Sequence, residues 1–363
     1  MSALPDRLRR RLLTALPLAA FLPGRDAHAK AEPLDPDEDV LFLPSTAREL
    51  GGGQIEVDLQ AWIYEKDRHW ILDAGLARYL GLDLDQMSPA ARLRFAQRTS
   101  LFHAEPEEGT VLDIDFGGDV PPVAMPSSDA AGRTQLRATL ALKPVARQAP
   151  WLRFHAVVAG PPPRRIEGRA LVVPAQGLSV ISDIDDTVKI TQVRDQQQML
   201  LNTFARRFAA VPGMAEHYRQ LARNPQTRFH YLSSSPIQLA PALGAFLQGE
   251  RFPPGSIHLR ESTTWRTLIP GDGEGRSHKL ASIRRLMEDF PDRRFLLVGD
   301  SGELDPEIYG EVARAQAQRI EGIVIRNASG EDRNAPRYAS AFEGVAPGRW
   351  HIHSDGEAWP LLR

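Results

Sequence analysis

The fold is decided by one stretch of the sequence, Leu178-Ser179-Val180-Ile181-Ser182-Asp183-Ile184-Asp185-Asp186-Thr187. Its first residues are mostly apolar and β-prone, as in a buried strand. Two acids follow directly, in the spacing D-x-D-x-T that runs from Asp183 to Thr187. Acids one residue apart on an extended chain project to the same side. The stretch therefore predicts a strand whose carboxyl end presents the side chains of Asp183 and Asp185 together.

The sequence around this strand, from residue 177 to residue 363, alternates between strand-like and helix-like patterns. After the strand at 178–182, further strands are expected at 228–232, 256–259, 294–298 and 322–326, and helices at 196–210, 214–223, 240–248, 279–289 and 306–315. Such alternation predicts an α/β domain in which a parallel sheet has helices on both faces. Ligands of such sheets bind at the carboxyl ends of the strands. A functional site is therefore expected where Asp183 lies.

The preceding segment, residues 38–174, has a different period. Residues 54–64 alternate polar and apolar side chains, and similar runs occupy 110–116, 135–142, 152–158 and 169–174. This alternation is typical of half-buried strands. Glycine-rich and proline-rich turns separate the runs, and one helix is expected, at 88–97. We therefore predict a smaller, mainly antiparallel β domain, whose role the sequence leaves open.

The composition limits the chemistry. The chain has 363 residues, of which 42% are hydrophobic and 25% charged, and its formal net charge of −2 gives no basic footprint for nucleic acid. The absence of cysteine excludes disulfides, thiolate metal ligands and a cysteine nucleophile. The chemistry must therefore use oxygen and nitrogen groups, and a nucleic-acid partner is not expected.

The first 29 residues have the order of a signal peptide. Arginines at positions 7, 9, 10 and 11 precede a 12-residue apolar run, Leu12 to Pro23, and Ala27-His28-Ala29 follows. A membrane-spanning helix needs about 20 apolar residues, so a cleaved segment is expected rather than an anchor. The sequence thus predicts an exported, periplasmic protein. A cytoplasmic protein with a short N-terminal extension is the alternative.

Two further strand ends carry polar side chains. The strand at 228–232 leads into Ser233-Ser234-Ser235-Pro236, and hydroxyls and free backbone N–H groups there can hold phosphate oxygens. The strand at 294–298 leads into a loop with two acids, Asp300 and Asp305. Mg²⁺ takes oxygen ligands and needs only one or two carboxylates besides a substrate phosphate, so Asp183 and Asp300 suffice. The ion would also relieve the repulsion between neighbouring carboxylates.

Together these motifs resemble those of the haloacid dehalogenase-like phosphatases, and more closely those of the actin-patch-associated phosphatidate phosphatase family. The resemblance covers about residues 177–330. It implies a Rossmann-like catalytic domain and an Mg²⁺-dependent phosphatase that hydrolyses phosphatidate or a related lipid phosphate through an aspartyl-phosphate. The motifs that carry it are Ser182-Asp183-Ile184-Asp185-Asp186-Thr187, Tyr231-Leu232-Ser233-Ser234-Ser235-Pro236, His278-Lys279 and Gly299-Asp300-Ser301-Gly302-Glu303-Leu304-Asp305-Pro306-Glu307-Ile308-Tyr309.

The resemblance also assigns roles to individual residues. Asp183 would be the nucleophile and Asp185 the general acid and base. Lys279 would hold the phosphate, with Lys189 as its nearest rival. The remaining expected site residues are Thr187, Ser233 and Ser234 for substrate binding, and Asp183, Asp185, Asp300 and Asp305 for Mg²⁺.

Two other functions stay open on the sequence. A non-catalytic phospholipid-binding module of this fold would lack the nucleophile, whereas Asp183 and Asp185 are both present. A phosphatase of small soluble phosphomonoesters is the second. A lipid substrate implies peripheral membrane contact, which a slightly acidic chain would make through a local patch. His351 and His353 share one face of an expected strand, but with no third metal ligand nearby a surface role is favoured.

Overall fold

The computed structural model describes residues 32–66, 70–141, 150–158, 163–261, 273–357 and 359. All of them belong to one compact unit, Ala31–Arg363. The signal peptide expected over residues 1–29 lies outside the described residues. Within the described ranges, no helix is both long enough and apolar enough to cross a membrane.

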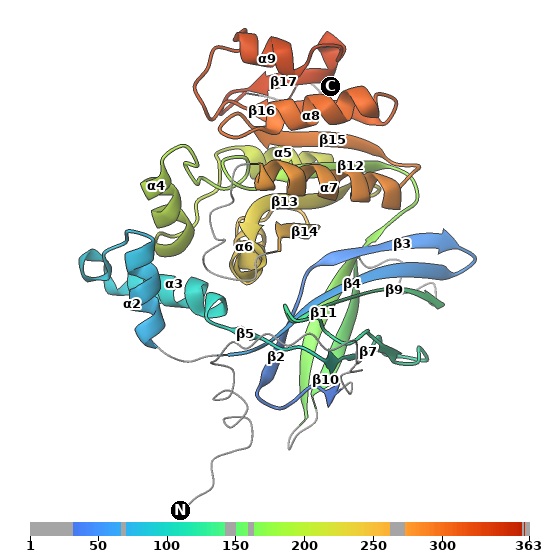
Figure 1. Ribbon diagram of the computed structural model, residues 1–363. Coiled ribbons are helices and arrows are strands. Elements are labelled where there is room, and N and C mark those ends of the chain that lie inside the picture. Colours follow the sequence, from blue (N-terminus) through green and yellow to red (C-terminus); the bar gives the residue numbers. More distant parts are fainter. Residues whose placement is uncertain are drawn as a thin grey trace, which may run out of the picture. The chain divides into compact units, whose positions relative to one another are not determined.

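Six strands of the C-terminal half form a parallel sheet (Figure 1). The strands are β12 (Leu178–Asp183), β13 (Arg228–Pro236), β14 (Gly255–Arg260), β15 (Arg294–Asp300), β16 (Ile320–Arg326) and β17 (Trp350–His353). Their order is β14-β13-β12-β15-β16-β17, and every neighbouring pair is parallel. This is the doubly wound order 3-2-1-4-5-6, in which the winding reverses beside the first strand. The carboxyl end of β12 therefore lies at the switch point, where such sheets bind their ligands.

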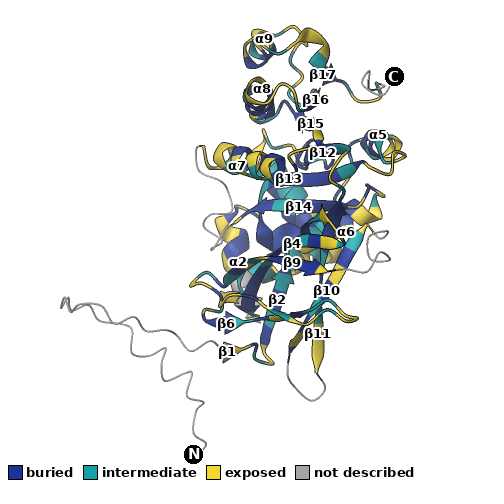
Figure 2. Ribbon diagram, turned by 90° about the vertical axis from the view of Figure 1, so that its right-hand side faces the viewer, coloured by how far each residue is buried: buried dark blue, intermediate teal, exposed yellow. Residues whose placement is uncertain are grey.

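Helices cover both faces of this sheet, as predicted. They are α5 (Met214–Leu221), α6 (Ala240–Gly249), α7 (Glu274–Asp289), α8 (Asp305–Ala315) and α9 (Pro336–Ala341). Val180 of β12 packs in the core shared with α5 and α6, which includes Tyr218. The next residue, Ile181, packs on the opposite face with Ile283 of α7 and Ile308 of α8. The strands are consequently buried on both sides (Figure 2).

The N-terminal half forms a nine-stranded sheet that is mostly antiparallel. Its strands are β2 (Glu38–Phe42), β3 (Ser45–Gly51), β4 (Gln54–Glu65), β5 (Glu105–Pro106), β7 (Asp113–Asp115), β8 (Val123–Ala124), β9 (Arg133–Ala141), β10 (Trp151–Val158) and β11 (Arg164–Val173). β11 pairs with β3 in parallel, and β1 (Glu32–Pro33) and β6 (Thr110–Val111) form a separate pair. Val57, Leu59 and Ile63 of β4 face one core, as the period of two predicts.

Two helical predictions were wrong. The helix expected at 196–210 is shorter: α4 (Gln196–Leu200) continues as a single π-helical turn at Leu201–Ala205 and then becomes extended. The reason lies in α3 (Pro89–Thr99), because Arg98 Nη1 donates to the carbonyls of Thr203 and Arg206, both at 2.8 Å. A longer helix would use those carbonyls itself. The N-terminal half also holds a second helix, α2 (Trp70–Tyr79).

Direct contacts join the two halves. The backbone N–H of Ile257 in β14 donates to the carbonyl of Pro44 at 2.8 Å. Arg285 of α7 lies 2.9 Å from the Asp58 carboxylate of β4. On the other side, Arg94 of α3 donates to the carbonyl of Ala205 at 2.9 Å. The last contact matters for the site, because the segment that it supports lines the pocket described below.

Candidate active site

Three carboxylates and one ammonium meet at the carboxyl edge of the parallel sheet. Asp183 ends β12, Asp300 ends β15 and Asp305 begins α8. Lys279 Nζ of α7 lies 2.7 Å from Asp183 Oδ1, 2.6 Å from Asp305 Oδ1 and 3.1 Å from Glu303 Oε2. Asp183, Asp300, Asp305 and Lys279 are all at most 2% exposed. The structure thus brings together four of the predicted site residues.

The charges of this cluster do not balance. Burial raises the pKa of Asp183 well above its ordinary value, the Lys279 ammonium lowers it, and Asp305 and Asp300 raise it again. Burial also raises the pKa of Asp300, and Asp305 adds to the rise. Burial lowers the pKa of Lys279, yet Asp183, Asp305 and Glu303 outweigh burial and hold it well above 10.5. One ammonium therefore faces an excess of carboxylates.

The donor set fits a hard divalent cation. One carboxylate oxygen from each of Asp183, Asp300 and Asp305 lies within 4.8 Å of the others. Among the described residues, the buried oxygens Asp183 Oδ2 and Asp300 Oδ1 have no hydrogen-bond partner. Buried acceptors without partners are costly, and an ion can satisfy them. An all-oxygen site of this kind suits Mg²⁺ better than softer metals.

Asp185 lies beside this cluster but has a different environment. Its Oδ1 lies 2.8 Å from Lys189 Nζ and accepts from Thr191 Oγ1 at 2.7 Å. Its Oδ2 accepts from the hydroxyls of Ser233, at 2.7 Å, and Ser235, at 3.1 Å. Burial raises the pKa of Asp185, but the Lys189 ammonium and these hydrogen bonds outweigh burial and lower it. Both oxygens of Asp185 have hydrogen-bond partners, and its side chain is not among the three clustered metal-ligand candidates.

The residues after Asp185 fix the loop that leaves β12. Asp186 has a φ of 55°, and its carboxylate accepts from the backbone N–H groups of Thr191, Gln192 and Val193 at 2.7–2.8 Å. Thr187 is fully buried, and its hydroxyl has no partner among the residues that the structure describes. The Thr187 side chain is therefore buried within this loop.

The serines of β13 divide into two kinds. Ser233 is fully buried, donates to Asp185 and accepts from the backbone N–H of Ser235 at 2.9 Å. Ser234 is partly exposed, and its carbonyl accepts from Arg260 at 3.1 Å. Of the two predicted substrate-binding serines, Ser233 contacts an acid of the site directly. Ser234 instead lines the pocket beside it.

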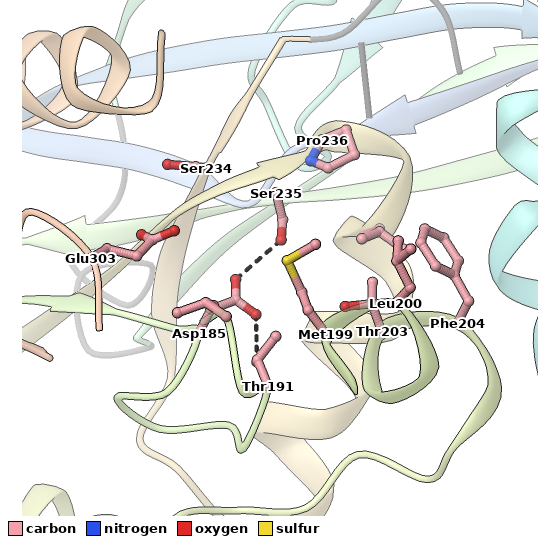
Figure 3. A pocket seen from close by; sticks show the side chains of 12 residues that line it. Asp185, Thr191, Met199, Leu200, Thr203, Phe204, Ser234, Ser235, Pro236 and Glu303 are labelled. Atoms are coloured by element: carbon pink, nitrogen blue, oxygen red, sulfur yellow. Dashed lines mark hydrogen bonds between the residues drawn. The ribbon is translucent and has the colours of Figure 1, made fainter. Parts of the chain in front are cut away.

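A pocket opens beside Asp185, and its wall is polar on one side and apolar on the other (Figure 3). Asp185, Ser234 and Glu303 lie on the polar side. The apolar side comes from the loop before α4, from α4 and the π-turn, and from the end of β13 with the short turn that follows it. Its residues are Val193, Met199, Leu200, Phe204, Pro236 and Leu239. A ligand there would place an ionic group near Asp185 and an apolar group against Met199.

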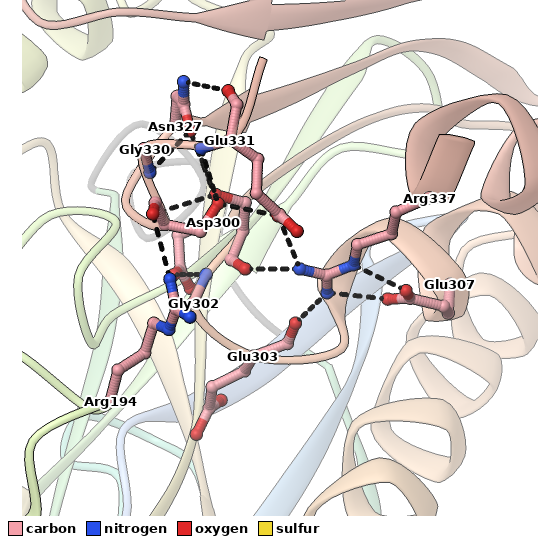
Figure 4. A network of polar contacts seen from close by, with 11 residues as sticks. Arg194, Asp300, Gly302, Glu303, Glu307, Asn327, Gly330, Glu331 and Arg337 are labelled. Carbon is pink, nitrogen blue, oxygen red and sulfur yellow. Dashed lines mark hydrogen bonds and ion pairs between the residues drawn. The ribbon is translucent and has the colours of Figure 1, made fainter. Parts of the chain in front are cut away.

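An arginine of α9 holds the loop that carries the acids (Figure 4). Arg337 lies 2.7 Å from Glu307 Oε1 and 3.2 Å from Glu331 Oε2. It also donates to the carbonyl of Ser301 at 2.7 Å and to that of Glu303. Arg337 of α9 therefore holds the loop between Asp300 and Asp305 in place. Such rigid support is what a preorganised site needs.

A close backbone approach shapes the same loop. A Cβ atom on Gly299 would clash with the Asp305 carboxylate and the Tyr309 ring. The backbone N–H of Asp300 donates to Asp305 Oδ2 at 3.2 Å, and that of Gly302 donates to Asp300 Oδ2 at 2.5 Å. Glycine at position 299 is therefore required for Asp305 to fold back over the end of β15.

Sequence reasoning missed several residues of the site. Thr191 contacts Asp185, and no pattern marks it in the sequence. Glu303 contacts Lys279 and lies within the recognised loop motif, but the sequence assigned it no role. Arg337 lies outside the recognised motifs and reaches the site only through the fold. Lys189, considered as the rival of Lys279, is also in the site, four residues after Asp185. Lys189 pairs with Asp185, whereas Lys279 pairs with Asp183 and Asp305.

Residues 178–327 match the family model described as phosphatidate phosphatase APP1, catalytic domain. Phosphatidate phosphatase APP1 of Saccharomyces cerevisiae is 35% identical over 171 residues, which are 46% of this chain and 28% of that protein. An uncharacterized protein of Schizosaccharomyces pombe is 35% identical over 167 residues, 43% of this chain and 26% of its own length. The chain thus spans less than a third of either relative. Residues 178–327 of this chain are thus similar to the catalytic domain of phosphatidate phosphatase APP1.

Proposed function

We propose that this chain is an Mg²⁺-dependent phosphatase with a haloacid dehalogenase-like catalytic domain, and that it hydrolyses phosphatidate or a related lipid phosphate. One observation carries the proposal: Asp183, Asp300 and Asp305 converge with Lys279 inside the segment that matches the phosphatase family. A non-catalytic lipid-binding module would have no need of a buried carboxylate cluster at the switch point, because burying like charges is costly.

The chemistry follows from the positions of the two acids. Asp183 would attack phosphorus, so that a carboxylate–phosphorus bond forms as the phosphorus–oxygen bond of the ester breaks. Asp185 would give a proton to the departing alkoxide and later take one from the water that hydrolyses the aspartyl-phosphate. Lys279, already 2.7 Å from Asp183, would offset charge on the phosphoryl oxygens. When bound, Mg²⁺ would supply charge neutralisation at the same oxygens.

The protonation of Asp185 is the step that the free site does not favour. In the absence of substrate, Lys189 and the hydroxyls of Ser233 and Thr191 lower the pKa of Asp185 below its ordinary value despite burial. A bound phosphate dianion would raise the pKa of Asp185 again, because a neighbouring negative charge raises a carboxyl pKa. If the Ser233 hydroxyl turns from Asp185 to a phosphate oxygen, the carboxylate also loses one donor. Substrate binding would thus prepare Asp185 as the acid.

Two features support a lipid rather than a soluble substrate. The yeast relative is named for phosphatidate, and the pocket beside Asp185 has the apolar wall that includes Met199 and Phe204. An alkyl group near the ester would lose water contact there, which is favourable. We therefore also propose peripheral contact with a membrane surface during turnover.

The experiment is a substrate screen with the metal controlled. The purified chain would be assayed on phosphatidate in mixed micelles and on glycerol 3-phosphate, with Mg²⁺, with a chelator, and with Mg²⁺ restored. We expect phosphatidate to be the better substrate, activity to vanish in chelator and to return with Mg²⁺. Asp300→Asn should raise the Mg²⁺ concentration required. Full activity in chelator would exclude the metal, and binding of phosphatidate without turnover would favour the non-catalytic module.

We propose, finally, that the chain is exported to the periplasm. The support is the sequence of residues 1–29 alone. Intact-mass measurement of the protein from its native host should show loss of about the first 29 residues. A full-length cytoplasmic species would exclude export.

A further inference from the structure

Two histidines at the end of β17 stand outside the proposed phosphatase chemistry. His351 and His353 lie on one face of this edge strand, two residues apart. His353 is fully buried, so the surface role favoured by the sequence is wrong for this residue. In the described part of the chain, neither ring nitrogen of His353 has a hydrogen-bond partner, and His351 Nε2 has none either. A buried imidazole without partners calls for an explanation, since desolvation of unpaired polar atoms is unfavourable.

A third ligand comes from the turn after the strand. The backbone N–H of Glu357 donates to the carbonyl of Ser354 at 3.1 Å, and that of Ser354 donates to Glu357 Oε2 at 3.1 Å. Gly356, at a φ of 86°, allows this turn to fold back. Glu357 thereby returns to the histidines, and one ligand atom from each of His351, His353 and Glu357 lies within 4.8 Å of the others. The sequence offered no third ligand because a tight turn supplies it.

We propose that His351, His353 and Glu357 bind a divalent transition metal of the zinc class. Two imidazoles and one carboxylate are a ligand set that zinc uses, with a fourth position for water or a further side chain. His217 of α5 is the candidate for that position, because its ring centroid lies 5.5 Å from that of His353 and its Nδ1 has no partner among the described residues. The proposal does not depend on the phosphatase function.

This second site differs from the carboxylate cluster in chemistry and place. Nitrogen ligands favour zinc, whereas the oxygens of Asp183, Asp300 and Asp305 favour Mg²⁺. His351 and His353 also lie beyond residues 178–327, the segment that matches the family model. A site at this edge of the sheet would be a property of this chain rather than of the shared catalytic segment.

The turn after β17 links the proposed zinc site to the loop that follows β12. Asp355 lies in the same turn, and its carboxylate accepts from Arg326 Nε at 2.7 Å and Nη2 at 2.8 Å. Arg326 Nη1 in turn donates to the backbone carbonyl of Asp186, beside Asp185, at 2.8 Å. A metal that fixes Glu357 would order this turn, and the turn holds Arg326 against the catalytic loop. The metal would therefore act as a structural brace rather than a reactant.

The test measures metal binding directly. Chelator-treated protein would be titrated with Zn²⁺ in excess Mg²⁺, which occupies the carboxylate cluster, and metal content would be read by mass spectrometry after gel filtration. We expect one zinc per chain and a higher Tm with zinc. Asp300→Asn should still bind one zinc. His351→Gln and His353→Gln should each lose it, whereas His155→Gln, a histidine of β10, should keep it.

Co²⁺ provides an independent readout that does not require turnover. Wild-type protein should develop visible d–d bands with Co²⁺, and His351→Gln should not. His351 is partly exposed, so this variant is expected to fold even if replacement of the buried His353 is not tolerated. Absence of zinc uptake by the wild-type chain, or equal uptake by His351→Gln, would overturn the proposal and leave buried water as the partner of His353.

Discussion

Two acids at the end of one strand differ because their neighbours differ. Asp183 faces other carboxylates and Lys279, and its pKa is raised by burial and by Asp305 and Asp300 against the opposing lysine. Asp185 faces Lys189 and hydroxyl donors, and its pKa is lowered despite burial. Paired groups whose environments push their pKa values apart commonly divide the roles of a reaction between them.

Replacement of each acid should therefore impair a different step. Asp183→Asn should abolish hydrolysis of alkyl and aryl phosphates alike, because no phosphoenzyme can form. Asp185→Asn should slow alkyl phosphates by about 10²–10⁴-fold, the usual contribution of a general acid. Aryl phosphates expel a stabilised phenolate, so this variant should release one rapid equivalent of p-nitrophenol and then stall.

Stopped-flow burst amplitudes on p-nitrophenyl phosphate measure this difference. A burst retained in Asp183→Asn and lost in Asp185→Asn would mean that the two roles are exchanged. If neither variant is impaired on either substrate, the reaction takes place elsewhere.

For individual residues, the sequence predicted the positions of the acids better than it predicted which side chains contact them. Asp183, Asp300 and Asp305 could be placed together because parallel strands and short loops end at one edge. The same spacing D-x-D recurs at Asp113 and Asp115 of β7, but there Asp113 is exposed and Asp115 only partly buried. The pairing of Lys189 with one acid and Lys279 with the other depends on side-chain directions that no linear pattern contains.

The segment α4 with its π-turn is the element that gives the pocket its apolar wall. Met199 is partly buried there, and Leu200 and Phe204 lie beside it. Met199→Gln should lower kcat/KM on long-chain phosphatidate about 5- to 10-fold, from roughly 1–1.4 kcal/mol of lost apolar contact. The same variant should leave kcat/KM on glycerol 3-phosphate within twofold, a range that covers about 0.4 kcal/mol.

The matched control is Gln197→Ala, an exposed position on the same short helix that does not line the pocket. This variant should leave kcat/KM unchanged on both substrates. Equal losses on both substrates in Met199→Gln would show that the segment supports the catalytic residues and does not contact the alkyl group.

The loop between β15 and α8 depends on α9. Arg337 holds the Ser301 carbonyl at 2.7 Å and pairs with Glu307 at 2.7 Å, and the loop positions Asp300 and Asp305. Arg337→Gln should loosen that loop and lower kcat by about 10- to 100-fold, since small displacements of reacting groups are costly. It should also raise the Mg²⁺ concentration needed for half-maximal activity.

Arg294→Gln is the comparison. Arg294 forms a similar ion pair with Glu321 at 2.7 Å, but both side chains are exposed. The pair lies at the amino ends of β15 and β16, whereas the candidate site lies at the carboxyl ends of the strands. Its loss should change kcat less than twofold, because exposed pairs contribute little. An unchanged Mg²⁺ requirement in Arg337→Gln would argue against a positioning role.

The elements themselves were predictable to different degrees. The strands β12 and β15 were predicted to within two residues of their ends because their apolar runs are short and bounded by turn residues, whereas β13 continues four residues beyond its predicted end. The helix α4 was predicted too long, since its end is imposed by Arg98 from a distant helix. Local pattern fixes a segment's type, whereas a side chain from elsewhere can decide where that segment stops.

At the scale of the whole molecule, the buried His230 and the partly buried His258 lie on neighbouring strands, and His258 lines a pocket where the two halves meet. His230 of β13 contacts the hydroxyls of Ser179, at 3.1 Å, and Ser256, at 2.7 Å. Burial lowers the pKa of His230 well below 6.5, with smaller contributions from His258 and nearby arginines. Burial likewise lowers the pKa of His258 to about 3. Both rings therefore stay neutral in the folded protein under conditions in which the unfolded chain would protonate them.

The contribution of these two histidines to the free energy of unfolding should consequently fall on mild acidification. A histidine with a depressed folded pKa contributes stability above the unfolded value of 6.5 and loses it as pH falls toward the folded value. Between pH 7.5 and 5.5, each of these two histidines should cost about 1.4 kcal/mol of the free energy of unfolding. The clustered carboxylates act in the opposite sense, because their raised pKa values favour proton uptake by the folded state.

A comparison of the wild-type chain with His258→Gln separates the contribution of His258 to the pH dependence of stability from that of the carboxylates. Urea unfolding at pH 7.5 and 5.5, both in excess Mg²⁺, would be compared for the wild-type chain and His258→Gln. The variant should lose about 1.4 kcal/mol less than the wild-type chain over this interval, whatever its stability at pH 7.5. Between pH 8.5 and 7.5 the two should change in parallel, because neither state binds a proton on this ring there. Parallel losses between pH 7.5 and 5.5 as well would mean that His258 is protonated in the folded protein, and that the region between the two halves is open to water.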